Sequence, residues 1–173
     1  MNDLSTHFST SELMCSCGRG RMNAHPKLIE LLERLHRAMN AKAVYINSGC
    51  RCPDHSVSVG GYKNDMHVLG GAVDIRVQKQ DGTFYNAFTI CREAEKIGFT
   101  GIAYISPDSA HVDIRGVIPY ANNHWFGNES TGENYKTFKD LGEPIQSGTT
   151  ADKTIDVILE IEGHKYSGLL SEI

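Results

Sequence analysis

The most informative segment of the chain reads His67-Val-Leu-Gly-Gly-Ala-Val-Asp-Ile-Arg76. Its last four residues, Val-Asp-Ile-Arg, recur at positions 112–115. In both copies apolar and charged residues alternate, which is the period-2 pattern of a strand with one buried face. Asp74 should therefore lie on the polar face of the first strand, and His111 and Asp113 on the polar face of the second. The pattern predicts two strands of one sheet that carry polar groups into a shared cleft.

Two amphipathic segments are typical of helices. Leucines recur every three or four positions in residues 23–40, and Phe, Ala and Cys repeat this spacing in residues 83–96. Short runs rich in β-formers at 43–47 and 101–105 add two further strands. These elements predict an α+β fold in which a small, mainly antiparallel sheet is flanked by two main helices, with the cleft on one face.

Composition excludes several classes of partner. The chain has 173 residues and a formal net charge of −4 at pH 7, so it suits one main domain and lacks the basic balance of a nucleic-acid-binding protein. No apolar run approaches the roughly 18 residues of a membrane span, and we expect no membrane insertion. Residues 1–8 contain neither a basic nor an apolar run. We therefore expect no signal peptide and synthesis in the cytoplasm.

The sequence divides into a main domain at 1–144 and an appendage at 145–173. Residues 146–150 are typical of a linker, and residues 154–161 and 164–170 are predicted to form a β-hairpin. An isolated hairpin is only marginally stable in water. We therefore expect the hairpin to pack on the domain, to pair with a second copy of the chain, or to bind a partner.

The chain contains five cysteines, Cys15, Cys17, Cys50, Cys52 and Cys91. Their odd number and the expected cytoplasmic origin argue against a disulfide framework. The two Cys-x-Cys pairs leave two alternatives open, a disulfide between the pairs or a four-thiolate zinc site. Structural zinc, however, usually binds Cys-x2-Cys or wider spacings. Cys91 falls on the apolar face of a predicted helix and is expected in the core.

A second constellation has the chemistry of a catalytic zinc site. His67 and Asp74 offer an imidazole and a carboxylate, and the glycines between them allow a tight turn. His111 would complete a set of two histidines and one carboxylate with an open fourth position, where zinc lowers the pKa of a water toward ~7. Asp108 stands three residues before His111. It is expected to act as the general base and then to protonate the leaving amine.

Four ordered motifs resemble those of the M15 peptidases. They are Asn47-Ser-Gly-Cys-Arg-Cys-Pro53, Val59-Gly-Gly61, His67-x2-Gly-x-Ala-x-Asp74 and Asp108-x2-His111-x-Asp113. The opening, His7-Phe-Ser-Thr-Ser-Glu-Leu-Met-Cys15, is similar to the N-terminal segment of the branch with small, bacterial-type domains. The resemblance covers about residues 5–127. It implies the M15 or hedgehog-like fold, with residues 1–144 as a zinc peptidase domain.

The resemblance also implies the site residues. A single Zn²⁺ would be held by His67, Asp74 and His111, and Asp108 would carry out the acid and base steps. Arg51 matches the arginine that binds the substrate carbonyl or carboxylate and stabilises the oxyanion. This catalytic task suits a guanidinium group, which is always charged and offers several donors.

Five further side chains have expected roles. Asp113 should orient a ligand or anchor its strand by an ion pair. Asp65, where many relatives have Ser, should accept a hydrogen bond behind the ligands or alter the fit of the substrate. Trp125 should line the cleft as a substrate-binding residue or cap the core. Arg76 and Arg115 should pair with carboxylates.

The substrate follows from the resemblance alone. M15 enzymes include D-Ala-D-Ala carboxypeptidases, D-Ala-D-Ala dipeptidases and L-alanyl-D-glutamate endopeptidases, some of them phage endolysins, which implies cleavage of peptidoglycan stem peptides. A wall substrate without a signal peptide fits a phage lysin that is released through a membrane pore, or an enzyme carried by the phage particle. Two alternatives are a non-catalytic zinc-containing module that binds the wall or a virion component, and a hydrolase of soluble peptides. The sequence leaves open which stem-peptide bond is cut, whether at a chain end or internally, and the oligomeric state.

Overall fold

The computed structural model describes most of the chain. The described residues are 3–118, 124–139, 141, 155–161 and 164–170, the last two ranges by their backbone only. Contacts between residues divide the chain into two compact units, residues 1–143 and 144–173. In the second unit β7 (Ile155–Ile161) pairs antiparallel with β8 (His164–Leu170), as the hairpin prediction required. The predicted linker at 146–150 lies outside the described residues, as does the turn between the two strands.

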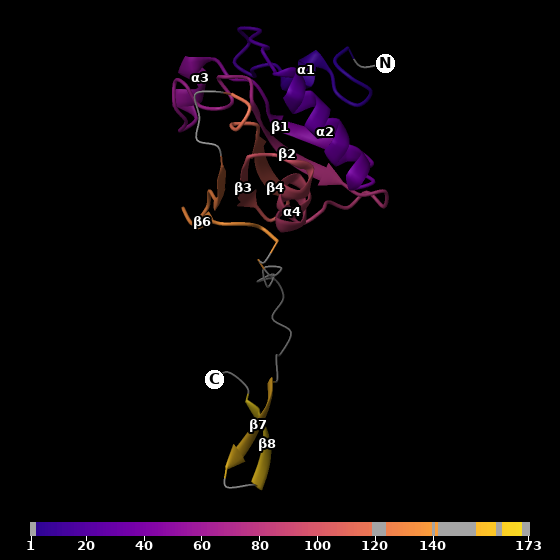
Figure 1. Cartoon of the computed structure of the whole chain (residues 1–173), viewed down its shortest axis with the longest axis vertical. Coiled ribbons are helices and arrows are strands. Elements are labelled where there is room, and N and C mark those ends of the chain that lie inside the picture. The colour runs from indigo at the N-terminus through magenta and orange to yellow at the C-terminus, as the bar shows by residue number, and fades with distance from the viewer. Residues whose placement is uncertain (1–2, 119–123, 140, 142–154, 162–163, 171–173) are drawn as a thin grey trace. The chain divides into compact units, whose positions relative to one another are not determined.

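The first unit is built on a six-stranded sheet with the strand order β1-β2-β4-β3-β5-β6 (Figure 1). The strands are β1 (Ala43–Ser48), β2 (Ala72–Gln78), β3 (Gly101–Ser106), β4 (Ser109–Asp113), β5 (Trp125–Asn128) and β6 (Asn134–Tyr135). Neighbouring strands pair antiparallel except β3 and β5, which run parallel. The predicted α+β class is thus confirmed, with a sheet larger than expected.

The described residues contain four helices, whereas the sequence indicated two main ones. They are α1 (Thr10–Leu13), α2 (Pro26–Ala38), α3 (Pro53–Ser58) and α4 (Ala87–Ile97). Helix α4 begins later than predicted because Asn86 caps it, its side chain accepting a hydrogen bond from the Phe88 amide at 2.8 Å. Among the described residues no helix combines the length and the apolar character that crossing a membrane requires.

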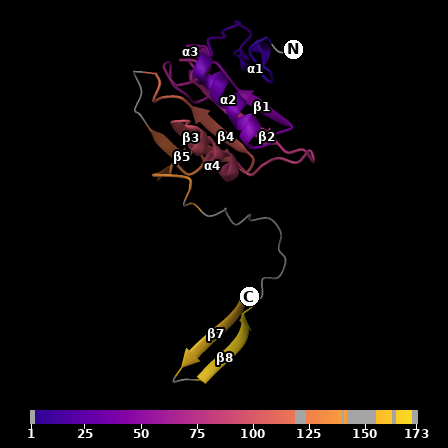
Figure 2. The ribbon, with the colours of Figure 1, turned by 45° about the vertical axis from the view of Figure 1, so that its right-hand side comes forward.

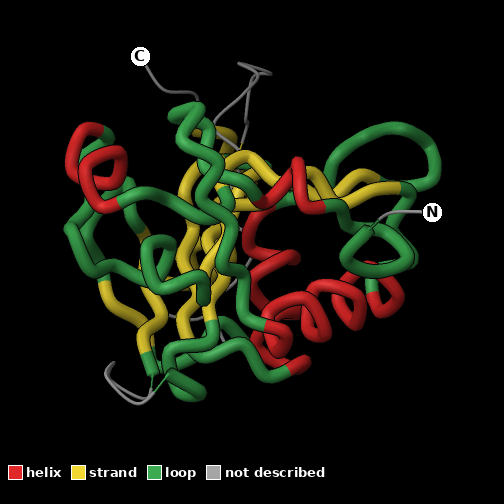
Figure 3. Tube along the Cα trace, turned by 90° about the horizontal axis from the view of Figure 1, so that it is seen from above, coloured by secondary structure: helices red, strands yellow, loops and turns green. Residues whose placement is uncertain are grey.

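The two faces of the sheet have opposite character. Along β2 the side chains of Val73, Ile75 and Val77 are fully buried, while those of Asp74 and Arg76 are half-buried. The buried valines and isoleucine join one core with the leucines of α2 and the apolar face of α4. Turned views show these two longer helices beside the strands (Figures 2 and 3). The sheet therefore presents an apolar face to the helices and a polar face to the loops opposite.

Leu32 of α2 tests this packing. Its side chain is completely buried in the core, so Leu32→Ala is expected to lower the free energy of unfolding by about 2–5 kcal/mol. Arg34→Ala, on the exposed side of the same helix, should change it by no more than about 0.5 kcal/mol. Urea denaturation of both variants measures the difference. Equal stability of the two variants would contradict the assignment of the buried face.

Candidate metal centre

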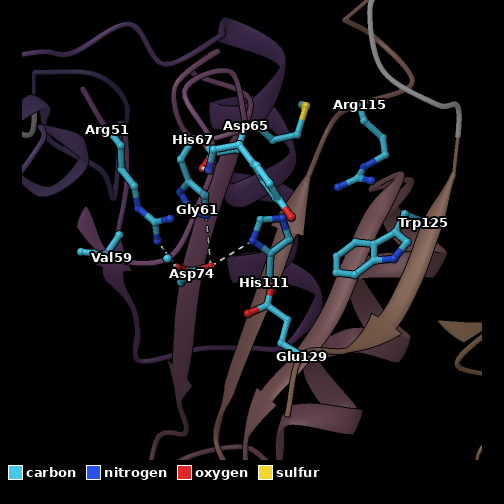
Figure 4. Close-up of a pocket in the computed structure, with 13 residues that line it drawn as sticks. Arg51, Val59, Gly61, Asp65, His67, Asp74, His111, Arg115, Trp125 and Glu129 are labelled. Atoms are coloured by element: carbon cyan, nitrogen blue, oxygen red, sulfur yellow. Dashed lines mark hydrogen bonds and ion pairs between the residues drawn. The ribbon is translucent and has the colours of Figure 1, made fainter. Parts of the chain in front are cut away.

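Three predicted ligands meet on the polar face of the sheet. The antiparallel register of β2 and β4 sets Asp74 directly opposite His111, and His67 reaches them from the turn before β2. One carboxylate oxygen of Asp74, Oδ1, lies 3.0 Å from His111 Nδ1 and 3.4 Å from His67 Nε2. The three side chains point toward one another in the close-up of the pocket (Figure 4), and their ligand atoms all lie within 4.8 Å of one another.

Each histidine is oriented by a second partner on its other ring nitrogen. His67 Nδ1 lies 2.9 Å from the carbonyl oxygen of Gly49, and His111 Nε2 lies 3.2 Å from Asp113 Oδ2. These contacts leave His67 Nε2 and His111 Nδ1 directed at Asp74. Metal-binding histidines are commonly fixed in this way, with the second nitrogen bonded to a carbonyl or a carboxylate.

The electrostatics of the site favour a positive charge between its carboxylates. Burial alone would raise the pKa of Asp74, but hydrogen bonds from His111 and His67 hold the pKa far below its usual range. Burial would lower the pKa of His111, yet hydrogen bonds to Asp113 and Asp74 raise it to about 10. In Asp113, hydrogen bonds from His111 and Arg115 outweigh burial and lower the pKa to about 2. The raised pKa favours the protonated form of His111 when no metal is bound.

These residues fit a divalent metal ion such as Zn²⁺. Two imidazole nitrogens and one carboxylate oxygen form the ligand set of many catalytic zinc sites, in which a fourth position stays open. The three ligands border a cleft of about 370 Å³. Among the described residues, no fourth side chain joins this group of potential ligands. A metal ion held by the three would therefore keep one position open to the cleft.

Arg51 lies beside the ligands. Its Nη2 donates to Asp74 Oδ2 at 2.9 Å, and its Nε donates to Ser48 Oγ at 2.9 Å. The side chain is 15% exposed and lines the cleft. A fixed guanidinium beside the three ligands is suited to binding a carbonyl or carboxylate oxygen.

Asp108 lies outside the cleft that the three ligands border. It lies in the turn between β3 and β4, where Arg76 Nε donates to its Oδ2 at 2.9 Å. Both side chains of this ion pair are 37% exposed, and neither residue lines the cleft. Arg76 pairs with a carboxylate, as predicted.

Glu129 is a carboxylate of the cleft that the sequence analysis missed. It follows β5 directly, and its backbone amide donates to the carbonyl oxygen of Tyr104 at 2.8 Å. This bond extends the parallel pairing of β5 with β3 and brings Glu129 to the cleft (Figure 4). The sequence contains no motif around Glu129, and its position follows only from this long-range strand pairing.

Asp65 also lines the cleft, and its carboxylate accepts hydrogen bonds from neighbouring residues of the chain. It accepts hydrogen bonds from the Ser56 hydroxyl, from the Val68 amide at 2.9 Å and from the Tyr62 amide at 3.3 Å. Asp65 therefore holds together the loop that leads into His67.

The opposite wall of the cleft contains Trp125 and Arg115. The indole lies edge-on to the His111 ring, with 6.1 Å between ring centroids, and the Arg115 guanidinium lies 4.9 Å from the centre of the indole. Arg115 also donates to Asp113 Oδ1 at 3.0 Å, the carboxylate pairing that was predicted. β4 ends at Asp113, so Arg115 lies beyond the strand in which its sequence pattern had placed it.

Zinc binding is expected to release about one proton per ion between about pH 7 and pH 9, because zinc requires a neutral imidazole and the pKa of His111 in the metal-free protein is raised to about 10. The apparent affinity should therefore fall about tenfold for each pH unit as the pH is lowered. Calorimetric titration in buffers of different ionisation enthalpy counts the protons. An affinity that does not vary over this range would contradict the protonation of His111.

Asp113→Asn is expected to weaken zinc binding about 10- to 100-fold, because the ring of His111 loses its carboxylate partner. Glu30→Gln on the exposed side of α2 is the matched control and should leave the affinity unchanged. Competition with a chelator of known affinity measures both variants. Equal affinities would show that Asp113 does not orient the ligand.

Comparison with known proteins agrees with this geometry. A family model described as Peptidase M15 matches residues 6–113, more than half of the 173-residue chain. The matched range contains His67, Asp74 and His111. No curated protein matches the chain. M15 peptidases are metalloenzymes that typically use zinc, and the resemblance identified in the sequence is confirmed. The chain therefore belongs to the peptidase M15 family of metallopeptidases.

Proposed function

We propose that the protein is a zinc peptidase that hydrolyses amide bonds in the stem peptides of peptidoglycan. The observation that carries the proposal is the convergence of His67, Asp74 and His111 on a cleft of about 370 Å³. A cleft of this volume suits a ligand of a few residues, since pockets for small ligands span roughly 300–1,000 Å³. Membership of the M15 family supports the reaction type.

Two guanidinium groups give the cleft a chemistry suited to acidic peptides. Arg51 and Arg115 both line it, on opposite sides of the ligand set. Stem peptides contain free carboxylates, which arginine binds through two parallel hydrogen bonds. Trp125 adds an apolar surface beside Arg115. We assign substrate binding to Arg51 and Trp125, and stabilisation of the oxyanion to Arg51.

Proton transfer needs a carboxylate near the reacting atoms. A zinc ion, when bound, supplies a water of lowered pKa and polarises the scissile carbonyl. We assign the general base to Asp108, which must exchange its contact with Arg76 for a contact inside the cleft. Glu129 is the alternative, because its side chain already lines the cleft. Either carboxylate would pass the proton on to the leaving amine.

The route to the substrate is part of the proposal. We infer that the enzyme reaches the wall after release from the cell or as a component of a phage particle. In the second case the C-terminal hairpin of β7 and β8 is the segment available for attachment. Proteomics of purified particles distinguishes the two routes.

Digestion of purified peptidoglycan tests the proposed function. The wild type is expected to release peptide fragments. Their masses, measured by mass spectrometry, identify the bond that is cut. Asp108→Asn should keep its zinc and lose at least about 100-fold in turnover, because general acid–base catalysis typically contributes 10²- to 10⁴-fold. Glu129→Gln is the matched variant and should retain most of the activity.

Other outcomes of this digestion would assign the general base or the function differently. Loss of turnover in Glu129→Gln with full activity in Asp108→Asn would transfer the general-base role to Glu129. Zinc binding without cleavage of wall or stem peptide would favour a non-catalytic wall-binding module. Cleavage of free peptides alone would favour a hydrolase of soluble peptides and overturn the wall substrate.

A further inference from the structure

Three cysteine thiols form a cluster away from the catalytic ligands. The Sγ atoms of Cys15 and Cys17 lie 3.2 Å apart, and those of Cys17 and Cys52 lie 3.5 Å apart. All three sulfurs lie within 4.8 Å of one another. The five cysteines of the chain all belong to the described residues, and all are free thiols. The cluster thus joins the N-terminal segment, which carries Cys15 and Cys17, to Cys52 at the start of α3.

The spacing of these sulfurs is close to that of a zinc site. With Zn–S bonds of about 2.3 Å in a tetrahedron, two sulfur ligands lie about 3.8 Å apart. The observed separations of 3.2 and 3.5 Å approach this value and require only a small outward shift. The Cys-x-Cys spacing argued against a metal site in the sequence, but here the third sulfur comes from Cys52. Cys50, its Cys-x-Cys partner, does not belong to the cluster.

An imidazole contacts the loop that carries two of these thiols, although its nitrogens do not lie within 4.8 Å of all three sulfurs and the ring would have to turn toward them to bind the same ion. His55 is in α3, three residues after Cys52, and its Nε2 lies 3.2 Å from the hydroxyl of Ser16. Ser16 stands between Cys15 and Cys17, so the ring contacts the same loop that carries two of the thiols. Three thiolates and one histidine are a common ligand set for structural zinc.

We propose that Cys15, Cys17 and Cys52, with His55 as the fourth ligand, bind a second and structural Zn²⁺. Soft thiolates select zinc over the hard cations Mg²⁺ and Ca²⁺. Four protein ligands close the site, in contrast to the open position at His67, Asp74 and His111.

The second metal would support the catalytic centre through residues 49–52. On one side of this segment the Cys52 amide donates to Cys15 Sγ at 3.2 Å, and the Cys50 amide donates to the Leu13 carbonyl at 2.8 Å. On the other side the Gly49 carbonyl contacts His67 Nδ1, and Arg51 contacts Asp74. The segment thus lies between the two metal centres.

Gly49 shows how closely the N-terminal segment packs on this support. A Cβ at Gly49 would overlap the backbone of Leu13, so only glycine allows this approach. The exposed ion pair of Arg19 with Asp54, at 3.0 Å, joins the same two segments beside the cluster. Because a surface ion pair contributes little stability, zinc would add a stronger link between these two segments than this ion pair does.

Cobalt substitution tests the second site, because the catalytic ligand set contains no sulfur. Protein produced in cobalt-supplemented medium is expected to hold two metal ions per chain and to show thiolate-to-cobalt charge-transfer absorption. His67→Ala should lose one ion and keep this absorption. Cys17→Ser should lose the other ion together with the absorption, and the exposure of Cys17 makes the substitution tolerable for folding.

Cys91→Ala is the matched control, since Cys91 is buried in α4 and outside the cluster, and it should keep both ions. His55→Ala should keep the fold and lose at least tenfold in metal affinity, and an unchanged affinity would remove His55 from the site. One metal ion and no charge-transfer absorption in the wild type would overturn the proposal. So would a disulfide, detected as fewer than five thiols alkylated in denatured, chelator-treated and unreduced protein.

Discussion

The pairing of β2 with β4 sets Asp74 opposite His111, and the rest of the site is arranged around this one contact. A slip of one residue would turn Asp74 toward the helices and leave a charge in the apolar core. Val73 and Ile75, on either side of Asp74, are fully buried and hold the register. The alternation of apolar and polar residues that buries Val73 and Ile75 therefore also directs Asp74 to the polar face of the sheet.

The acidic and basic side chains of the site alternate in one chain of contacts, which Arg51 extends at Asp74. Asp113 is fully buried, and it contacts Arg115 and His111, which in turn contacts Asp74. Burying two carboxylates so close to each other is costly unless positive charge lies between them. The raised pKa of His111 favours a protonated ring there when no metal is bound, and a divalent ion would supply the positive charge when it is bound. This requirement explains why an ordinary α+β domain carries so polar a face.

Much of this arrangement follows from local sequence patterns. The period-2 repeats predicted β2 and β4, and the spacing of histidine and carboxylate predicted the residues that converge on the cleft. Helix α3 was missed because its six residues contain too little periodicity to separate it from the surrounding loop. Glu129 was missed because it reaches the cleft through the parallel pairing of β5 with β3, which no local pattern encodes. The grouping of Cys52 with Cys15 and Cys17, without Cys50, depends likewise on long-range packing.

The proposed activity depends on a zinc ion bound between His67, Asp74 and His111. Crystallographic data from zinc-loaded protein, collected on both sides of the zinc absorption edge, test it directly. We expect an anomalous difference peak within bonding distance of His67 Nε2, a carboxylate oxygen of Asp74 and His111 Nδ1. Full zinc loading with no peak at these three side chains would contradict it.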